Sequence, residues 1–360
     1  MSAITEGGTT SDSTGVRAAI RNFVRIGRHY LTMLLGMIAF QLTGRTPAGA
    51  YQSMIALFCA TGGKSNDVIS RCFSFIHAPY ALPKPTSGII TGESEDLSSA
   101  ARTLKEKGFY VSPSRISDAV CDELLRVALA HPCVTDSDDG GKGNAERYDR
   151  ERPQAVRYTI EPDALVNEPA VQKLISDPSL IWLAQEYLGS KPVLDHIVLW
   201  WTTSWNKTPD GQAAQLYHFD MDKVKFLKFF IYITDVGPQS GAHCFIQRSH
   251  RSNGIPPALL QRGYARISDD DVRKYYRPED FVEITGPRGT ILAEDTRGLH
   301  KGKLLETGDR LVFQLEFSNS LFGSDRRPFR LSEVHVPEFR AALNKYPRLY
   351  SHFDIQAQRV

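Results

Sequence analysis

The chain has 360 residues, of which 41% are hydrophobic and 23% charged, a composition typical of folded globular proteins. Its formal net charge is only +2, so no overall basic field supports binding to nucleic acid, and we expect no nucleic-acid partner. The five cysteines form no CxxC pair and follow no regular spacing, which favours reduced thiols and a cytoplasmic location.

The first 96 residues are predicted to form three segments. Residues 1–15 are rich in Gly, Ser and Thr and are expected to be disordered. Residues 16–80 are predicted to form a helical N-terminal extension, because an apolar run there ends at a Gly-Gly pair. Residues 81–96 contain two prolines and two glycines and are interpreted as a linker.

One stretch of the extension allows several interpretations. Arginines recur every four residues at Arg17, Arg21 and Arg25, and an apolar run follows at residues 30–44. That run is shorter than the roughly 20 residues that a membrane-spanning helix needs. The pattern loosely resembles a signal peptide, but it also fits a helix packed on the protein body or a basic amphipathic helix on a membrane surface. We favour the packed helix, because most amphipathic helices are half-buried, and keep peripheral membrane contact as the alternative.

Residues 97–360 are predicted to form one domain of the α+β class with a β-rich core. Residues 97–108 have the pattern of a helix closed by Gly108, and Ser117 is placed to cap a second helix. From about residue 190 to 320, short segments rich in aromatic and β-branched residues alternate with Gly, Pro, Asn and Asp clusters. Many short strands separated by turns are typical of a β-sandwich or barrel.

The run His218-Phe219-Asp220 precedes a strongly β-prone segment. Because alternate residues of a strand share a face, an imidazole and a carboxylate are expected side by side there. His300 follows 82 residues after His218, and Arg310 lies ten residues beyond it. Two histidines and one carboxylate with open positions form the ligand set of non-haem Fe(II) oxygenases. The same tripeptide recurs at residues 352–354 without a later strand or histidine, so we interpret that copy as accidental surface residues.

The ordered set of His218, Asp220, a Ser-His turn at residues 249–250, His300 and Arg310 resembles the phytanoyl-CoA dioxygenase (PhyH-like) family of Fe(II)- and 2-oxoglutarate-dependent oxygenases. The resemblance covers about residues 97–325. It implies a double-stranded β-helix, which is a cupin-like jelly roll, with flanking helices. It also implies that His218, Asp220 and His300 are the catalytic iron ligands. Arg310 would bind the C5 carboxylate of 2-oxoglutarate through its planar guanidinium, with O2 as the other co-substrate.

The second partner of that carboxylate is not fixed by the motif. Relatives often have a hydroxyl two residues after the distal histidine, where this sequence has Gly302. Candidates for cofactor binding are Gln215 and Thr290, and the hydroxyls of Thr296 and Tyr232 are alternatives.

Residues that would meet the substrate are assigned by position. They are Trp201, Arg157 and Tyr158. Because Trp200 and Trp201 point to opposite faces of one strand, one is expected in the core and the other in the cavity. Three lysines beside the iron motif are interpreted as a solvated strand face: Lys223, Lys225 and Lys228.

The expected function is an Fe(II)- and 2-oxoglutarate-dependent dioxygenase that hydroxylates a small-molecule or acyl-type metabolite and releases succinate and CO2. The carboxylate of Asp220 favours oxygen insertion or hydrogen removal over halogenation, since related halogenases have a small residue there that leaves room for chloride. The alternative is a non-catalytic or other-metal jelly-roll (cupin-like) binding protein. Such proteins generally cluster more histidines and have no use for Arg310.

Overall fold

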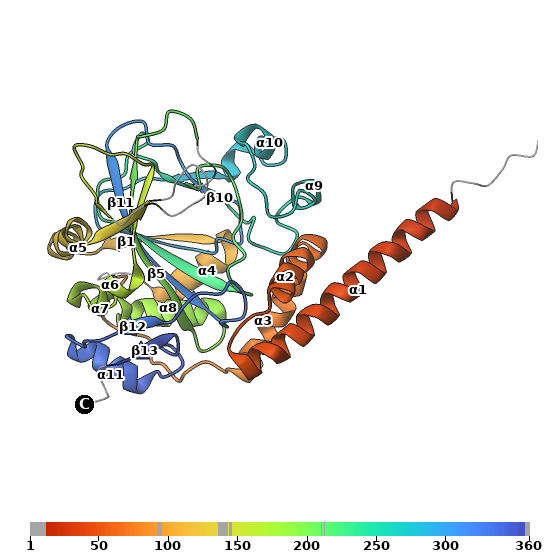
Figure 1. The fold of residues 1–360 in the computed structure, drawn as a ribbon, viewed down its shortest axis with the longest axis horizontal. Coiled ribbons are helices and arrows are strands. Elements are labelled where there is room, and N and C mark those ends of the chain that lie inside the picture. Colours follow the sequence, from red (N-terminus) through yellow and green to blue (C-terminus); the bar gives the residue numbers. More distant parts are fainter. Residues whose placement is uncertain are drawn as a thin grey trace, which may run out of the picture.

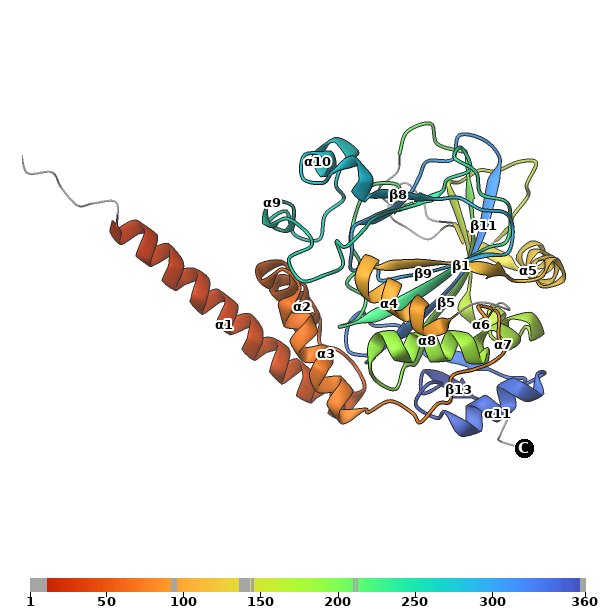
Figure 2. The same cartoon turned by 180° about the vertical axis from the view of Figure 1, so that it is seen from behind.

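The computed structural model describes residues 12–91, 96–135, 143, 146–209, 211 and 213–356. Three helices come first, α1 (Asp12–Thr43), α2 (Ala48–Thr61) and α3 (Lys64–Ile76). Residues 1–11 of the segment expected to be disordered lie outside the described residues, and 12–15 instead form the first turn of α1, so the prediction was wrong there. Both views show α1 projecting from the body, with α2 and α3 between it and the rest of the molecule (Figures 1 and 2). No helix among the described residues is long and apolar enough to cross a bilayer.

The two helix boundaries read from the sequence are confirmed. Helix α4 (Leu97–Lys107) ends at Gly108, which has the left-handed φ of 91° that a residue without Cβ adopts at low cost. Helix α5 (Asp118–Ala130) begins after Ser117, whose hydroxyl accepts a hydrogen bond from the Val120 amide. Strand β1 (Phe109–Arg115) connects the two helices.

A large antiparallel sheet forms the centre of the molecule. Its eight strands lie in the order β1, β9 (Thr290–Glu294), β6 (Phe226–Tyr232), β11 (Asp309–Ser318), β5 (Val193–Thr203), β4 (Arg157–Ile160), β2 (Pro132–Thr135) and β3 (Glu146–Arg147). Strands β5, β6 and β11 are buried along almost their whole length. These are segments that the sequence predicted as strands.

A smaller sheet of three strands has the order β10 (His300–Gly302), β7 (His243–Ile246) and β8 (Phe281–Ile284). Between β6 and β11 the chain crosses repeatedly between the sheets: β6, β9 and β11 belong to the large sheet, whereas β7, β8 and β10 belong to the small one. A separate parallel pair joins β12 (Phe329–Leu331) to β13 (Phe353–Ile355).

The large sheet is covered on both faces. Along β5, Ile197, Leu199 and Trp201 face a core built with the helices α4 and α5, whereas Val198 and Trp200 face the space toward the small sheet. That helical layer also includes α6 (Pro162–Leu165), α7 (Pro169–Ile175), α8 (Pro178–Leu188) and α11 (Pro337–Lys345). Burial of both faces explains why residues 197–201 of β5 form a continuous apolar run rather than an alternating pattern.

A third core joins the N-terminal helices to the run around residue 219. Phe58 of α2 stacks on Phe219, with ring centroids 5.3 Å apart. The buried Asn66 amide donates a hydrogen bond to the Val224 carbonyl at 3.0 Å. The short helices α9 (Pro257–Leu260) and α10 (Asp269–Arg273), and the 3-10 turn η1 (Pro278–Asp280), lie in the connection between β7 and β8. The N-terminal helices therefore pack directly behind the predicted metal ligands.

Replacing Phe58 with Ala should lower the free energy of unfolding by about 3–5 kcal/mol, because it empties a fully packed site against Phe219. The matched control is Phe75→Ala on α3, where the side chain is 90% exposed and the cost should be below about 0.5 kcal/mol. Denaturant unfolding of both variants measures the difference. Equal midpoints would show that the N-terminal helices do not share the core of the domain.

Candidate metal centre

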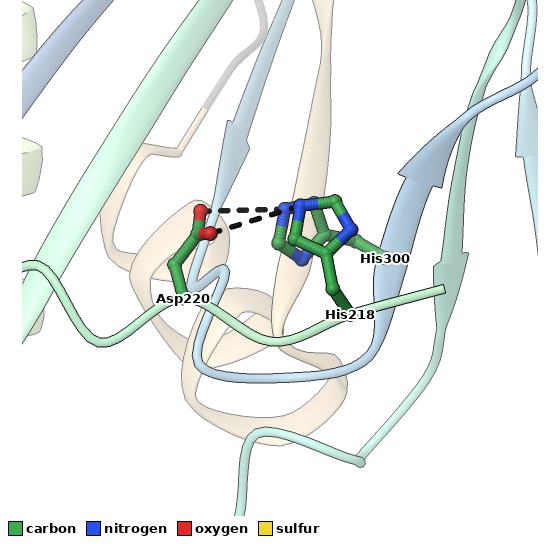
Figure 3. A group of neighbouring side chains, drawn as sticks. All are labelled: His218, Asp220 and His300. Atoms are coloured by element: carbon green, nitrogen blue, oxygen red, sulfur yellow. Dashed lines mark ion pairs between the residues drawn. The ribbon is translucent and has the colours of Figure 1, made fainter. Parts of the chain in front are cut away.

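The structure brings together His218, Asp220 and His300 (Figure 3). The amide of His218 donates to the carbonyl of His300 at 3.0 Å, and the reverse bond measures 2.9 Å. This antiparallel bridge extends the small sheet beyond β10. The Asp220 amide donates to the Thr296 carbonyl at 2.7 Å. One ligand atom from each of the three side chains lies within 4.8 Å of the others, and the two histidines are each only 5% exposed.

The ring orientation of both histidines is set by backbone carbonyls. Nδ1 of His218 lies 2.9 Å from the Leu216 oxygen, and Nδ1 of His300 lies 3.0 Å from the Gly298 oxygen. Because a carbonyl only accepts, Nδ1 is the donor and Nε2 keeps its lone pair. The two Nε2 atoms face Asp220 at 3.7 Å and 3.3 Å. Three hydrogen-bond acceptors therefore converge with no donor among them. A cation bound between them, or a proton shared by two of them, would relieve their mutual repulsion.

The surroundings shift the pKa values of the three side chains in different ways, so their protonation states differ. Burial, reinforced by the charge of His300, lowers the pKa of His218 well below 6.5, so its ring is neutral. Burial acts the same way on His300, but the Asp220 carboxylate outweighs it and raises the pKa. Burial would raise the pKa of Asp220, whereas the charges of Lys228 and His300 hold it well below its usual range. The shared proton therefore belongs to His300 when no cation is bound.

Lys228 is the main electrostatic partner of the candidate ligand Asp220. Its ammonium donates to Asp220 Oδ2 at 2.6 Å and to Asp222 Oδ2 at 2.9 Å, and lies 3.5 Å from Glu316. Burial would lower the pKa of Lys228, but these carboxylates raise it well above its usual range. Arg326 lies 3.0 Å from Asp222 and 3.2 Å from Glu316, yet burial still raises the pKa of Glu316 to about 8.

The interpretation of the three lysines as a solvated face was wrong. Lys228 is buried in this charge network, and Lys223 is buried with its ammonium donating to the Ser324 carbonyl at 2.6 Å. Lys225 is partly buried and donates to the Tyr187 carbonyl at 2.9 Å. Sequence reasoning missed their role because acidic partners such as Glu316 lie on a strand far away in the chain.

A cavity of about 250 Å³ lies beside the three ligands and contains Arg310 in its wall. Arg310 is 6% exposed. Its guanidinium donates to the Gly241 carbonyl and, at 3.3 Å, to the Thr202 hydroxyl. Burial lowers the pKa of Arg310, but a guanidinium in a protein stays charged. Among the described residues, no carboxylate forms an ion pair with the Arg310 guanidinium, and its Nε has no hydrogen-bond partner.

Thr290 and Gln215, the first candidates to assist Arg310, are engaged elsewhere or lie outside the cavity wall. Thr290 uses its hydroxyl to donate to the Pro287 carbonyl at 2.7 Å, and Gln215 does not line the cavity. Tyr232 donates its hydroxyl hydrogen to the Ile284 carbonyl at 2.9 Å, but it is also an electrostatic neighbour of Arg310. Thr202 is the neighbour, because β5 pairs it directly opposite Arg310. A Cβ at Gly302 would lie 3.5 Å from the guanidinium, so glycine at this position leaves Arg310 open to the cavity.

The assignment of substrate-facing residues is corrected in two of three cases. Trp201 is fully buried on the helical side of the large sheet, with its ring 4.8 Å from that of Tyr148. Tyr158 faces the same side, and its hydroxyl accepts a hydrogen bond from the Ala155 amide at 3.0 Å. Trp200 and Arg157 line the cavity, with the guanidinium 4.7 Å from the Trp200 ring centroid. Shifting a strand by one residue moves every side chain to the opposite face of the sheet. The sequence alone did not determine which alternate side chains face the cavity.

The second tripeptide, at residues 352–354, forms no metal cluster within the described part of the chain. Its histidine is nevertheless buried, and Phe353 belongs to β13, so the interpretation as surface residues was wrong. The Phe353 ring packs in the hydrophobic core beside α11.

No family model matches the sequence, and no curated protein sequence matches it. Solved structures do resemble the fold. The non-heme α-ketoglutarate-dependent epimerase SnoN from nogalamycin biosynthesis is 18% identical, with a TM-score of 0.42 over 62% of this chain and 82% of its own. HygX from Streptomyces hygroscopicus, with nickel and 2-oxoglutarate bound, is 16% identical, with a TM-score of 0.45 over 67% and 93%. The carbocyclase SnoK is 16% identical, with a TM-score of 0.41 over 62% and 84%.

Metal binding should release protons near neutral pH, because the raised pKa of His300 keeps a proton where the metal would bind. Affinity should therefore rise as the pH increases from below 6.5 through the His300 pKa and then level off. Calorimetric titration with Mn(II) in buffers of different ionisation enthalpy should count about one proton per metal. The matched control is His352→Asn, which should bind normally, whereas His300→Asn should not. Affinity independent of pH would contradict the assigned protonation.

Proposed function

We propose that the protein is an Fe(II)- and 2-oxoglutarate-dependent dioxygenase. The observation that carries the proposal is the convergence of three donor-free acceptors, two imidazoles and one carboxylate, in the wall of the cavity that also contains Arg310. The donor set suits Fe(II), which accepts imidazole nitrogen and carboxylate oxygen with open positions left for small ligands. The unpaired guanidinium suits the distal carboxylate of 2-oxoglutarate.

The fold gives the proposal a scaffold. We infer that the two sheets are the halves of a double-stranded β-helix, since the chain crosses from one sheet to the other four times between β6 and β11. In this arrangement residues 97–360 form the catalytic domain, residues 16–80 its helical extension and residues 81–96 the linker. The resemblance of the metal and Arg310 motifs to PhyH-like oxygenases supports placement in that family.

Different residues of the chain would have different roles at the site. His218, Asp220 and His300 would hold the iron, and Leu216 and Gly298 fix the histidine rings through their carbonyls. Lys228 keeps Asp220 ionised and in place. Arg310 would bind the C5 carboxylate of 2-oxoglutarate, with Thr202 orienting the guanidinium. When bound, iron with 2-oxoglutarate and O2 supplies the oxidising power that converts a substrate C–H to C–OH, with succinate and CO2 as co-products.

The substrate would be a small molecule or an acyl-type metabolite, since the cavity beside the ligands measures only about 250 Å³. Trp200 and Arg157 form the wall that it would meet. We propose a cytoplasmic enzyme with no nucleic-acid partner. A jelly-roll binding protein without catalysis is the competing function, and the same experiment separates the two.

The test is anaerobic titration with Fe(II) and then 2-oxoglutarate, followed by addition of O2 and measurement of succinate. We expect one metal site, saturable 2-oxoglutarate binding and slow succinate release even without substrate. Arg310→Lys should weaken 2-oxoglutarate binding about 10- to 100-fold, the loss expected for charge-assisted hydrogen bonds, without changing metal affinity. Arg330→Lys, an exposed arginine on β12, serves as the matched control.

Metal binding without 2-oxoglutarate binding would favour the binding-protein alternative. No succinate from the intact protein, or unchanged metal affinity in His218→Ala, would reject the dioxygenase. Thr202→Val should weaken 2-oxoglutarate binding less than Arg310→Lys, because the hydroxyl acts through the guanidinium.

A further inference from the structure

The positive charge of this chain is unevenly distributed. Residues 13–66 contain six basic residues and no Asp or Glu. The whole chain has 43 basic and 41 acidic residues, so the remainder is slightly acidic. Four of the six, Arg17, Arg21, Arg25 and Arg28, belong to α1, the helix that projects from the body (Figures 1 and 2). A region with cations and no counter-charge attracts anionic partners.

One face of α1 is already occupied by the protein. Met33 is buried, and Ile26, Met37 and Phe40 pack against the same core. These residues recur at intervals of three, four and seven, which places them along one side of the helix. The inner face thus accounts for the contact of α1 with α2.

The opposite face of α1 is apolar and exposed. We call it the outer stripe; its side chains are between 52% and 82% exposed, and they are Ile20, Val24, Leu31, Leu35, Ile38 and Leu42. The spacing is again three, four or seven residues, so the six side chains lie along one line. Phe23 and Leu34 widen the stripe on one side. A solvent-facing helix normally has polar residues there, so this face has the composition of a surface that another phase or molecule covers.

The arginines border the outer stripe. Arg17, Arg21 and Arg28 each precede a residue of the stripe by three positions, which is one helical turn. Long arginine side chains lying beside an apolar face extend their charge toward phosphate groups while their methylenes stay in the apolar layer. A basic flank beside an apolar stripe of Leu, Ile and Phe is the pattern of a helix lying in a membrane interface.

We propose that α1 docks on an anionic lipid surface, with the outer stripe in the acyl boundary and Arg17, Arg21 and Arg28 on the headgroups. The helix would lie along the bilayer, because it is not apolar enough to cross it. A second copy of the chain would place the same uncompensated arginines close together, which charge repulsion opposes. Acidic lipids supply the opposite charge and an apolar layer at once.

Flotation of the full chain with vesicles tests the proposal. Recovery should be high with phosphatidylcholine mixed with phosphatidylserine, low with phosphatidylcholine alone, and reduced by added salt. The double variant Arg21→Gln/Arg28→Gln should lower the partition coefficient about 25-fold, or about fivefold for each arginine. The variant Leu31→Ser/Ile38→Ser should also lose binding, since it removes apolar area from the stripe.

The matched control is Arg126→Gln/Arg340→Gln, which removes two exposed arginines from α5 and α11, helices on the other side of the body (Figure 1). It should float like the unaltered protein. Equal recovery with neutral and anionic vesicles would overturn the proposal, as would equal loss in both arginine variants. A dimer that the Leu31→Ser/Ile38→Ser variant dissociates, in a protein that does not float, would assign the stripe to a second copy instead. Thermal unfolding of each variant verifies that the fold is intact.

Discussion

The structure around the site depends on one constraint: three hydrogen-bond acceptors are buried at a single point with no donor among them. Backbone carbonyls hold both imidazole rings with Nε2 inward. The bridge between His218 and His300 fixes their separation. Burying an ionised carboxylate is costly unless it is paired, and Lys228 supplies that pairing for Asp220 at 2.6 Å. The protein thus maintains a rigid set of converging acceptors that a divalent cation would complete.

The pairing of Lys228 extends into the large sheet. Glu316 lies opposite His196 and Phe317 opposite Leu194, so Asp195 is the extra residue of a β-bulge. The bulge places the Asp195 carboxylate 3.2 Å from Arg326. Through Arg326, Asp222 and Lys228, buried charges therefore connect the central strands to the candidate iron ligand. Removing one member would leave a buried charge without its partner. The loss of stability would then exceed the net contribution of the intact network to stability.

Those parts of the fold governed by local chemistry could be predicted from the sequence. Gly108 and Ser117 act through their own backbone and hydroxyl, and the central strands are recognisable from their apolar runs. The candidate ligands were identifiable because their chemistry and order are distinctive. What could not be predicted depends on pairing across the sheet. Neither the choice of Trp200 over Trp201 nor the position of Thr202 beside Arg310 can be known before the register is fixed.

The N-terminal helices connect the two proposed surfaces of the molecule through one packed path. The inner face of α1 lies on α2, and Phe58 of α2 stacks on Phe219, the residue between two of the candidate ligands. Phe219 also contacts the Tyr264 ring at 5.6 Å, in the connection between β7 and β8. Packed cores transmit displacement because they have few voids. The inner face of α1 and the metal ligands are thus joined by one continuous series of packed side chains, which runs through α2 and Phe219.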